Sequence, residues 1–412
     1  MEENKSRIKS NFLWNTIGSL FFLVCQWLIT VLVVRLSDDY TAAGTLSLAM
    51  SITNIFAIIA LFNVRNYQVS DTENRFSQSE YLAFRTVTVS LAFLLCIITS
   101  FVLGYNAYTV ACIIAYMVLK LTENYADVFH GIAQRKWRLD IAGKSLLFRG
   151  FLMILSFVIV FSLTKDLLSS IIIMALTNLL SLLVYDLNAV RRIERLSLRS
   201  ADAWRRMGEL FRICLPMVIY GIAINCMMPV SKCILEAVHG TEMLGYYSSV
   251  TTVSMLIQTF VMLVFTPLIG VFGEAFSKGD RAAIARTLLK LIIMIGAITA
   301  VGLGLSAFFG EFVMTLVFGD GITPYVYLLY PTVIISALTA LVWLLGMVLV
   351  VMRSMKCLLA GSIAGFVLSL TLSLILVRST LFSGINTALM LGFGLVGAIY
   401  LLRFIYYTIR GK

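Results

Sequence analysis

Charge is scarce in this chain. Only 13% of its 412 residues are Asp, Glu, Lys or Arg, whereas 60% are hydrophobic and the mean hydropathy is +0.95. A water-soluble domain needs far more polar surface, so the composition excludes the soluble classes and predicts an integral membrane protein. The apolar runs are too long for barrel strands and lack their alternation of lumen-facing and lipid-facing residues, so we expect an all-α membrane protein.

Histidine and proline are also rare. With only His130 and His239, a histidine-based metal site is excluded from our expectations. All seven cysteines lie in apolar runs and none forms a CxxC pair, so we interpret them as core residues without disulfides or a metal. No Walker motif appears, and the predicted outer loops are too short for a catalytic domain. We therefore predict no enzymatic activity and no cofactor, with a proton or sodium gradient as the remaining energy source.

Long apolar windows are abundant, and they set the topology. Their approximate bounds are 11–34, 44–64, 83–103, 107–129, 144–163, 167–187, 210–235, 246–270, 286–309, 322–350, 356–377 and 384–407. If the N-terminus is cytoplasmic, 27 of the 32 Lys and Arg fall on the cytoplasmic side and three fall outside. This asymmetry explains the net charge of +11 without nucleic acid, and it predicts a multi-pass protein of the bacterial plasma membrane with both termini cytoplasmic.

A basic segment in the middle of the chain divides the windows into two sets of six. We predict an N-terminal six-helix lobe (1–188), a basic cytoplasmic linker (189–209) and a C-terminal six-helix lobe (210–412). At an offset of 201, Gly44 aligns with Gly245 and Arg85 with Arg286, each near the start of the equivalent window. Such a repeat predicts a pseudo-two-fold axis along the membrane normal. The alternative is that short membrane loops simply favour Gly and Ser.

Three segments carry a resemblance to a known family. They are "FNVRNYQVSD" (62–71), "ADVFHGIAQRKWRLDIAGKSLLFRGF" (126–151) and the segment 243–280, which begins "MLGYYSSVTTVSM". They resemble the polysaccharide flippases of the multidrug/oligosaccharidyl-lipid/polysaccharide exporter superfamily. The resemblance implies two six-helix lobes around a central cavity, and movement of a polyprenyl-diphosphate-linked oligosaccharide to the outer leaflet. It supplies no compact motif from which site residues could be transferred.

The stretch "LKLTENYADVFH" (119–130) places charge inside an apolar window. Lys120, Glu123, Asn124 and Asp127 have the i, i+3, i+4, i+7 spacing of one helix face. Charges at that depth are costly in lipid, so we expect them to line a hydrated cavity that binds the diphosphate and sugar. The alternative is a self-contained Lys120–Glu123 and Lys120–Asn124 network between packed helices.

Two arginines near the cytoplasmic ends of their windows are further cavity candidates. Arg65 and Arg149 could bind phosphate as planar forks, or could simply reach the lipid headgroups.

The seventh window carries three more candidates. Asn225 and Lys232 are predicted to line the cavity, although Lys232 and Glu236 also have the spacing of a surface ion pair. Pro229 lies inside the window, where proline removes a backbone hydrogen bond and bends a helix, so we predict a gate or hinge there.

These observations favour a flippase that works by alternating access. Its predicted partners are the lipid-linked oligosaccharide, membrane lipids and, for surface polysaccharide synthesis, a glycan polymerase or glycosyltransferases. The alternatives are a cation-coupled drug antiporter of the same superfamily, a membrane glycan polymerase or ligase, and a lipid-binding scaffold that transports nothing.

Overall fold

The computed structural model describes residues 2–71, 73–194, 202–254, 257–258, 268–278 and 280–410, and these are almost entirely helical, with no strand among them. The chain divides into two compact units. Unit 1 comprises Met1–Asp38 and Thr45–Val218, and unit 2 comprises Asp39–Gly44 and Ile219–Lys412. The passage from one unit to the other therefore lies inside a helix, α10, two residues after Pro216.

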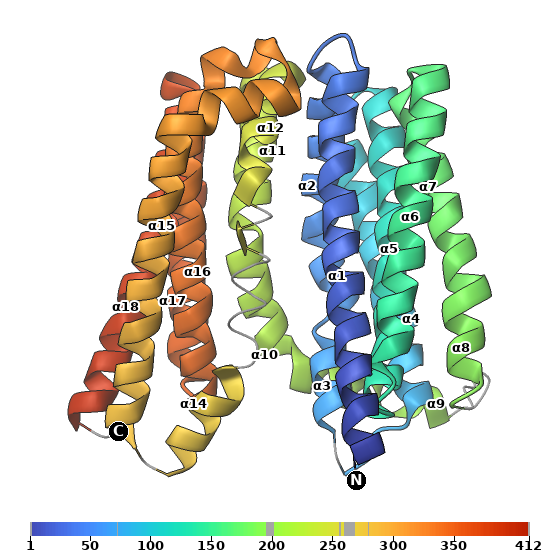
Figure 1. Ribbon diagram of the computed structural model, residues 1–412, viewed down its shortest axis with the longest axis vertical. Coiled ribbons are helices and arrows are strands. Elements are labelled where there is room, and N and C mark those ends of the chain that lie inside the picture. Colours follow the sequence, from blue (N-terminus) through green and yellow to red (C-terminus); the bar gives the residue numbers. More distant parts are fainter. Residues whose placement is uncertain are drawn as a thin grey trace. The chain divides into compact units, whose positions relative to one another are not determined.

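Unit 1 is built from long, roughly parallel helices with short segments at the end where the N-terminus lies (Figure 1). The elements are α1 (Glu2–Leu36), α2 (Thr41–Leu61), α3 (Val64–Ser70), α4 (Gln78–Val102), α5 (Ala107–Arg135), α6 (Leu139–Thr164), α7 (Leu167–Ser181), a π-helix (Leu182–Asp186), α8 (Leu187–Arg191), α9 (Asp202–Arg205) and α10 (Met207–Asn225). The start of α2 and the end of α10 belong to unit 2.

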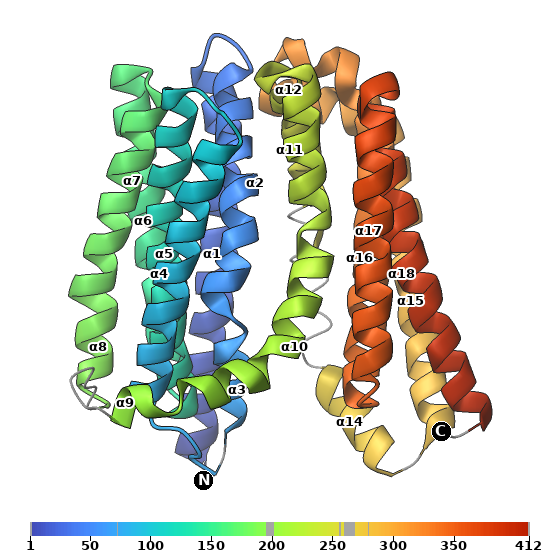
Figure 2. The same ribbon diagram turned by 180° about the vertical axis from the view of Figure 1, so that it is seen from behind.

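Unit 2 contains the long helices of the second half, which Figure 2 shows from behind. Its elements are α11 (Met227–His239), α12 (Thr241–Thr251), α14 (Leu268–Ser277), α15 (Arg281–Phe318), a 3₁₀ helix (Asp320–Leu328), α16 (Leu329–Val351), α17 (Met355–Thr380) and α18 (Phe382–Arg410).

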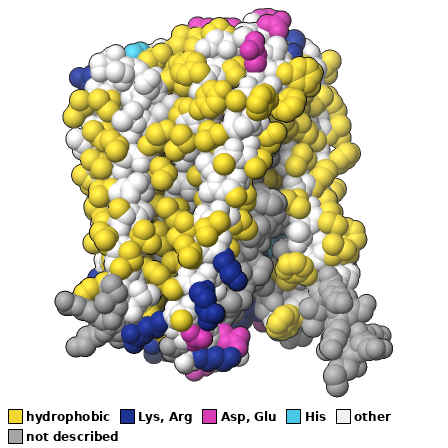
Figure 3. All heavy atoms as spheres, turned by 60° about the vertical axis from the view of Figure 1, so that its left-hand side comes forward, with side chains coloured by type: hydrophobic (Ala, Val, Ile, Leu, Met, Phe, Trp, Pro, Cys, Tyr) yellow, Lys and Arg dark blue, Asp and Glu magenta, His cyan; other side chains and the backbone are white. Residues whose placement is uncertain are grey.

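Apolar side chains cover the outside of the molecule as well as filling its interior. Ten helices of the described chain are long and apolar enough to cross a membrane. In α15 only 11% of the most apolar window is buried, and Phe308 on that helix is 85% exposed. Figure 3 shows apolar side chains over most of the described face, with Lys and Arg gathered toward its lower end. This distribution fits a protein solvated by lipid around its middle.

Small residues let helices of unit 1 approach closely. A Cβ built on Gly18 of α1 would lie 2.1 Å from the Gly143 carbonyl oxygen of α6, and one on Gly143 would lie 2.2 Å from the Trp14 carbonyl oxygen. The backbones of α1 and α6 are thus in direct contact, as is common where membrane helices associate through small residues.

A short piece of the first half of the chain belongs to unit 2. The Tyr40 hydroxyl donates to the Phe318 carbonyl oxygen at 3.0 Å, and the Tyr40 ring stacks on Tyr246 with centroids 4.2 Å apart. A Cβ on Gly245 would lie 2.2 Å from the Tyr40 carbonyl oxygen and 3.1 Å from the Gly44 backbone nitrogen. Gly44 and Gly245, which the repeat aligned with each other, therefore meet at the starts of α2 and α12.

Most predicted windows correspond to observed helices, with differences at three places. The window 210–235 is not one helix, because it is interrupted at Cys226 between α10 and α11. The window 246–270 corresponds to α12 and the start of α14, and its residues 255–256 and 259–267 lie outside the described residues. The window 322–350 begins as a 3₁₀ helix rather than an α-helix.

Candidate functional site

A sharp break after α2 creates the first part of the site. Phe62 and Asn63 have φ values of 44° and 54°, in the left-handed region that non-glycine residues rarely adopt. The break leaves carbonyl groups at the end of α2 without helical partners. The Ala60 carbonyl oxygen accepts hydrogen bonds from Arg85 Nη1 at 2.7 Å and from Thr88 Oγ1 at 2.8 Å. Two side chains of α4 thus cap α2, and they fix Arg85 in place.

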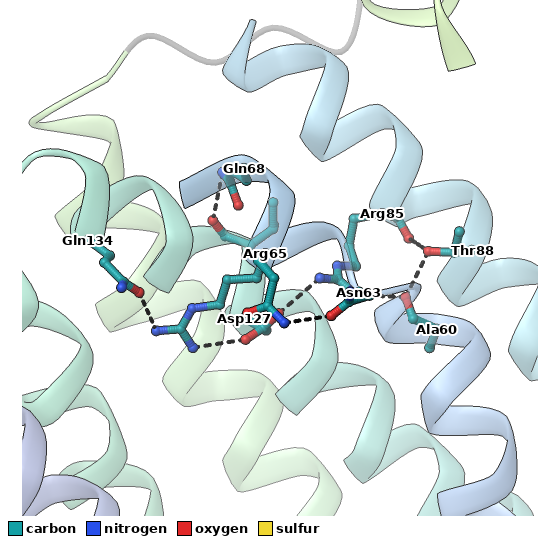
Figure 4. Close-up of polar contacts among 10 residues, drawn as sticks. Ala60, Asn63, Arg65, Gln68, Arg85, Thr88, Asp127 and Gln134 are labelled. Carbon is teal, nitrogen blue, oxygen red and sulfur yellow. Dashed lines mark hydrogen bonds and ion pairs between the residues drawn. The ribbon is translucent and has the colours of Figure 1, made fainter. Parts of the chain in front are cut away.

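Asp127 on α5 joins two arginines (Figure 4). Its Oδ1 accepts from Arg65 Nη1 at 3.0 Å, and its Oδ2 accepts from Arg85 Nη2 at 2.9 Å. The Arg85 side chain is fully buried, whereas that of Arg65 is 30% exposed and also donates to Gln134 Oε1 at 3.0 Å. With two guanidinium groups and one carboxylate, the cluster carries a net charge of +1, and its accessible cation is Arg65.

Lys120 and Glu123 form a separate pair nearer the start of α5. Lys120 Nζ lies 2.9 Å from Glu123 Oε2, and the two side chains are only 13% and 15% exposed. Gln26 of α1 donates to Glu123 at 3.4 Å, and the Lys120 ammonium lies 5.8 Å from the centroid of the Tyr116 ring. Gln26 and Tyr116 also line a cavity of about 10 Å³, which is room for about one water molecule.

The charged residues of the predicted stripe on α5 therefore belong to two separate groups, the Lys120–Glu123 pair and the Arg65–Asp127–Arg85 cluster. Asn124 is buried at 6% exposure, unlike the three charged residues with which it was grouped, and its amide nitrogen has no partner within the described chain. The Lys120–Glu123 contact anticipated by the alternative interpretation is present. That these residues bind substrate stays a prediction.

Arg149 lies in a different environment from Arg65. It is 1% exposed, and its Nη2 donates to Asp186 Oδ2 at 2.7 Å. The other carboxylate oxygen of Asp186 lies 3.1 Å from His130 Nε2. Arg149 is thus enclosed in this conformation and does not share the accessible surface of Arg65, so its role in substrate binding stays a prediction without geometric support.

The remaining candidates lie around the break between α10 and α11. Asn225 is exposed and donates to the Gly221 carbonyl oxygen of its own helix at 2.9 Å. Pro229 is in the first turn of α11, and its missing N–H leaves the Asn225 carbonyl without the usual i+4 donor, which is consistent with the break at Cys226. Lys232 is half-buried, and it makes neither a hydrogen bond nor an ion pair with any residue that the structure describes. The predicted pair with Glu236 is therefore absent.

Sequence reasoning did not include Arg85, Asp186 and His130 among the site residues. Arg85 was noted only as a repeat position near the start of the window 83–103, and only the folded chain shows that it reaches Asp127. Asp186 and His130 are 56 positions apart, so nothing local in the sequence indicates their contact. A signal was nevertheless present, because each is a polar residue within or next to an apolar window.

Comparison with known proteins supports the fold more strongly than the family. No protein-family model matches the chain. A capsular polysaccharide biosynthesis protein of Staphylococcus aureus, CapF, is 24% identical over 313 residues, which are 75% of this chain and 77% of that protein.

Several solved structures are similar over nearly the whole chain. An inward-facing multidrug resistance MATE family transporter of the MOP superfamily has a TM-score of 0.74 at 14% identity and covers 97% of this chain and 98% of its own. The Vibrio cholerae MATE transporter VcmN, in a mutant form, has a TM-score of 0.66 at 12% identity, covering 100% and 99%. A eukaryotic MATE transporter also has a TM-score of 0.66, at 13% identity, covering 97% and 96%.

These likenesses confirm the predicted fold class. The chain is an all-α, multi-pass membrane protein with the fold of the MATE transporters.

Proposed function

We propose that this protein is a flippase that moves a polyprenyl-diphosphate-linked oligosaccharide across the bacterial plasma membrane by alternating access. The similarity to CapF, whose name assigns it to capsular polysaccharide biosynthesis, supports this substrate class. The fold shared with MATE transporters supports transport rather than catalysis. The observation that carries the proposal is the Arg65–Asp127–Arg85 cluster, with its net positive charge and one accessible guanidinium group.

The arrangement around Asp127 allows Arg65 to exchange partners at low cost. When a diphosphate oxygen replaces Asp127 as the acceptor for Arg65, the buried Arg85 still has Asp127 as its counter-ion. No buried charge is left unpaired, which would otherwise cost several kcal/mol. Arg65 gains a doubly charged, multidentate acceptor that suits a planar guanidinium group.

Lys232 is a second cation that suits an anionic substrate. It is half-buried on α11 and has no counter-ion in the part of the chain that the structure describes. A half-buried ammonium without a counter-ion can bind an anion without breaking an existing contact. We propose that Lys232, in unit 2, is a second phosphate-binding residue that acts independently of Arg65 in unit 1.

The remaining features of the proposal concern the cell. Both termini face the cytoplasm, the polyprenyl tail stays in lipid, and an ion gradient drives the cycle. A glycan polymerase and glycosyltransferases act on the same lipid before and after transport.

A second candidate is a cation-coupled drug antiporter. The printed description of the similar inward-facing structure, a multidrug resistance transporter, favours it. Such a protein would need an accessible carboxylate for a cationic drug, whereas Asp127 is already bonded to two arginines.

The test is flipping in proteoliposomes that contain a fluorescent polyprenyl-diphosphate trisaccharide, followed by quenching of the outer-leaflet dye. We expect the protein to accelerate flipping, and R65Q and K232Q each to lower the rate by about tenfold, the loss of one charge-assisted hydrogen bond. K278Q is the matched control, because Lys278 is an exposed lysine paired with Glu274. A protein that expels a cationic dye but leaves the labelled lipid in place would establish the antiporter instead.

A further inference from the structure

The contact between His130 and Asp186 lies deep in unit 1. His130 is 5% exposed, Asp186 is 0% exposed and Arg149 is 1% exposed. Arg149 approaches one carboxylate oxygen at 2.7 Å and His130 approaches the other at 3.1 Å. An ionised carboxylate only accepts hydrogen bonds, so His130 Nε2 carries its hydrogen and Nδ1 is the atom that remains to be protonated.

The backbone at Asp186 is unusual. The helical span Leu167–Arg191 contains one π-helical turn, Leu182–Asp186. Such turns occur frequently at functional sites. Just before this turn, Asn178 and Ser181 are exposed by 1% and 0%. Both side-chain atoms of Asn178 and the Ser181 hydroxyl have no partner in the described chain. Buried polar groups are normally bonded, so this face of the helix has unused capacity for water or for a change of partners.

The charges of the triad balance only while His130 is neutral. Arg149 and Asp186 cancel each other, so a proton on His130 leaves a net charge of +1 in a site with almost no exposure. Each carboxylate on the described elements that pack against α5 already has a partner. Arg65 on α3 and Arg85 on α4 are paired with Asp127 on α5. Glu80 on α4 accepts from the Ser77 backbone N–H, and Asp140 on α6 pairs with Arg138. The other titratable and charged groups on these elements include Lys144 and Arg149 on α6, Tyr185 and Asp186 on the π-helix and Arg191 on α8.

We propose that His130 is the binding site for the coupling proton of this transporter. A proton from bulk water forms a new N–H bond at Nδ1 when the triad becomes hydrated, and it returns to water when the triad closes into the arrangement seen here. Because the closed triad has balanced charges and almost no solvent exposure, we infer that an added proton favours the hydrated conformation. The assignment as a coupling site rests on the proposed transport function, whereas proton binding at His130 does not.

The chain offers an unusually clean measurement, because it contains only two histidines. In protein labelled with ¹⁵N-histidine, H239N leaves His130 as the single signal. His239 lies at the end of α11, with Nε2 2.6 Å from the Val377 carbonyl oxygen. The NMR spectrum of H239N in lipid nanodiscs is recorded from about pH 8.5 to about pH 5, and we expect the neutral Nε2–H tautomer to give way to the imidazolium on acidification. An imidazole that remains neutral over this whole range overturns the proposal.

Hydrogen exchange tests whether the proton is linked to the conformation. After correction for the intrinsic rate, we expect amide exchange in 126–135 and 182–191 to rise by up to about tenfold per pH unit on acidification, as for one linked proton. The rise should persist in H239N and disappear in H130N, which retains a hydrogen-bond donor for Asp186. An equal rise in H130N, or none in the unsubstituted protein, refutes the linkage and leaves the triad a structural one. Neither measurement uses a lipid substrate, so failure of the flippase proposal would not affect the result.

Discussion

Replacing Asp127 with Asn should destabilise unit 1 far more than replacing Arg65 with Gln. The D127N change leaves Arg85, whose side chain is fully buried, without a counter-ion. Removing one partner of a buried ion pair costs about 3–5 kcal/mol. Arg65 is 30% exposed and leaves Asp127 paired with Arg85, so R65Q should cost less than about 1 kcal/mol.

The two variants can be compared by thermal unfolding in one detergent. A unit of about 200 residues loses roughly 2 °C of melting temperature for each kcal/mol, so we expect a decrease of about 6–10 °C for D127N and of less than about 2 °C for R65Q. Transport should not follow stability in R65Q, which remains folded but flips the lipid about tenfold more slowly. If R65Q unfolds as readily as D127N, Arg65 is part of the framework and the exchange of partners at Asp127 is wrong.

Two further predictions concern stability outside the charged cluster. A G245A substitution should lower the melting temperature, because its Cβ would lie 2.2 Å from the Tyr40 carbonyl oxygen. G394A is the control, because a Cβ there meets nothing within 4 Å, and its higher helix propensity should add about 0.5–1 kcal/mol to the free energy of unfolding. Equal effects of the two substitutions would contradict the docking of Tyr40 on α12. The pKa of Asp71 is raised by burial but lowered more strongly by hydrogen bonds from the backbone N–H groups of Arg75 and Phe76 and from the Tyr81 hydroxyl, so it lies below its ordinary value. The ionised Asp71 carboxylate therefore contributes its full stabilisation above about pH 4, the unfolded-state pKa, and this contribution is lost as the pH falls through the lower pKa of the folded state. D71N should be less stable than the unsubstituted protein at pH 7 and similarly stable in strong acid. A difference in stability that persists in acid would contradict a role for the ionised carboxylate.

The sequence predicted the fold class because hydropathy and helix length are local properties. The windows located most helices, and the spacing on α5 identified residues that do form ion pairs, such as Lys120 with Glu123. The sequence could not predict which residues of other helices these side chains contact. Nothing near Asp127 in the sequence indicates Arg85, which is 42 positions away, and the i+4 spacing of Asn124 from Lys120 did not reveal that its side chain packs inward.

The same limit explains why Lys232 is more informative in the structure than in the sequence. In the sequence it had an available partner, Glu236, and the ordinary interpretation was a surface pair. In the fold, Arg65, Arg85, Lys120 and Arg149 each pair with a carboxylate of unit 1, whereas Lys232 of unit 2 has no counter-ion among the described residues. A paired buried charge can serve the framework alone, so it says little about a ligand. A half-buried cation without a counter-ion, such as Lys232, can bind an anion that arrives and leaves during transport without losing an existing contact.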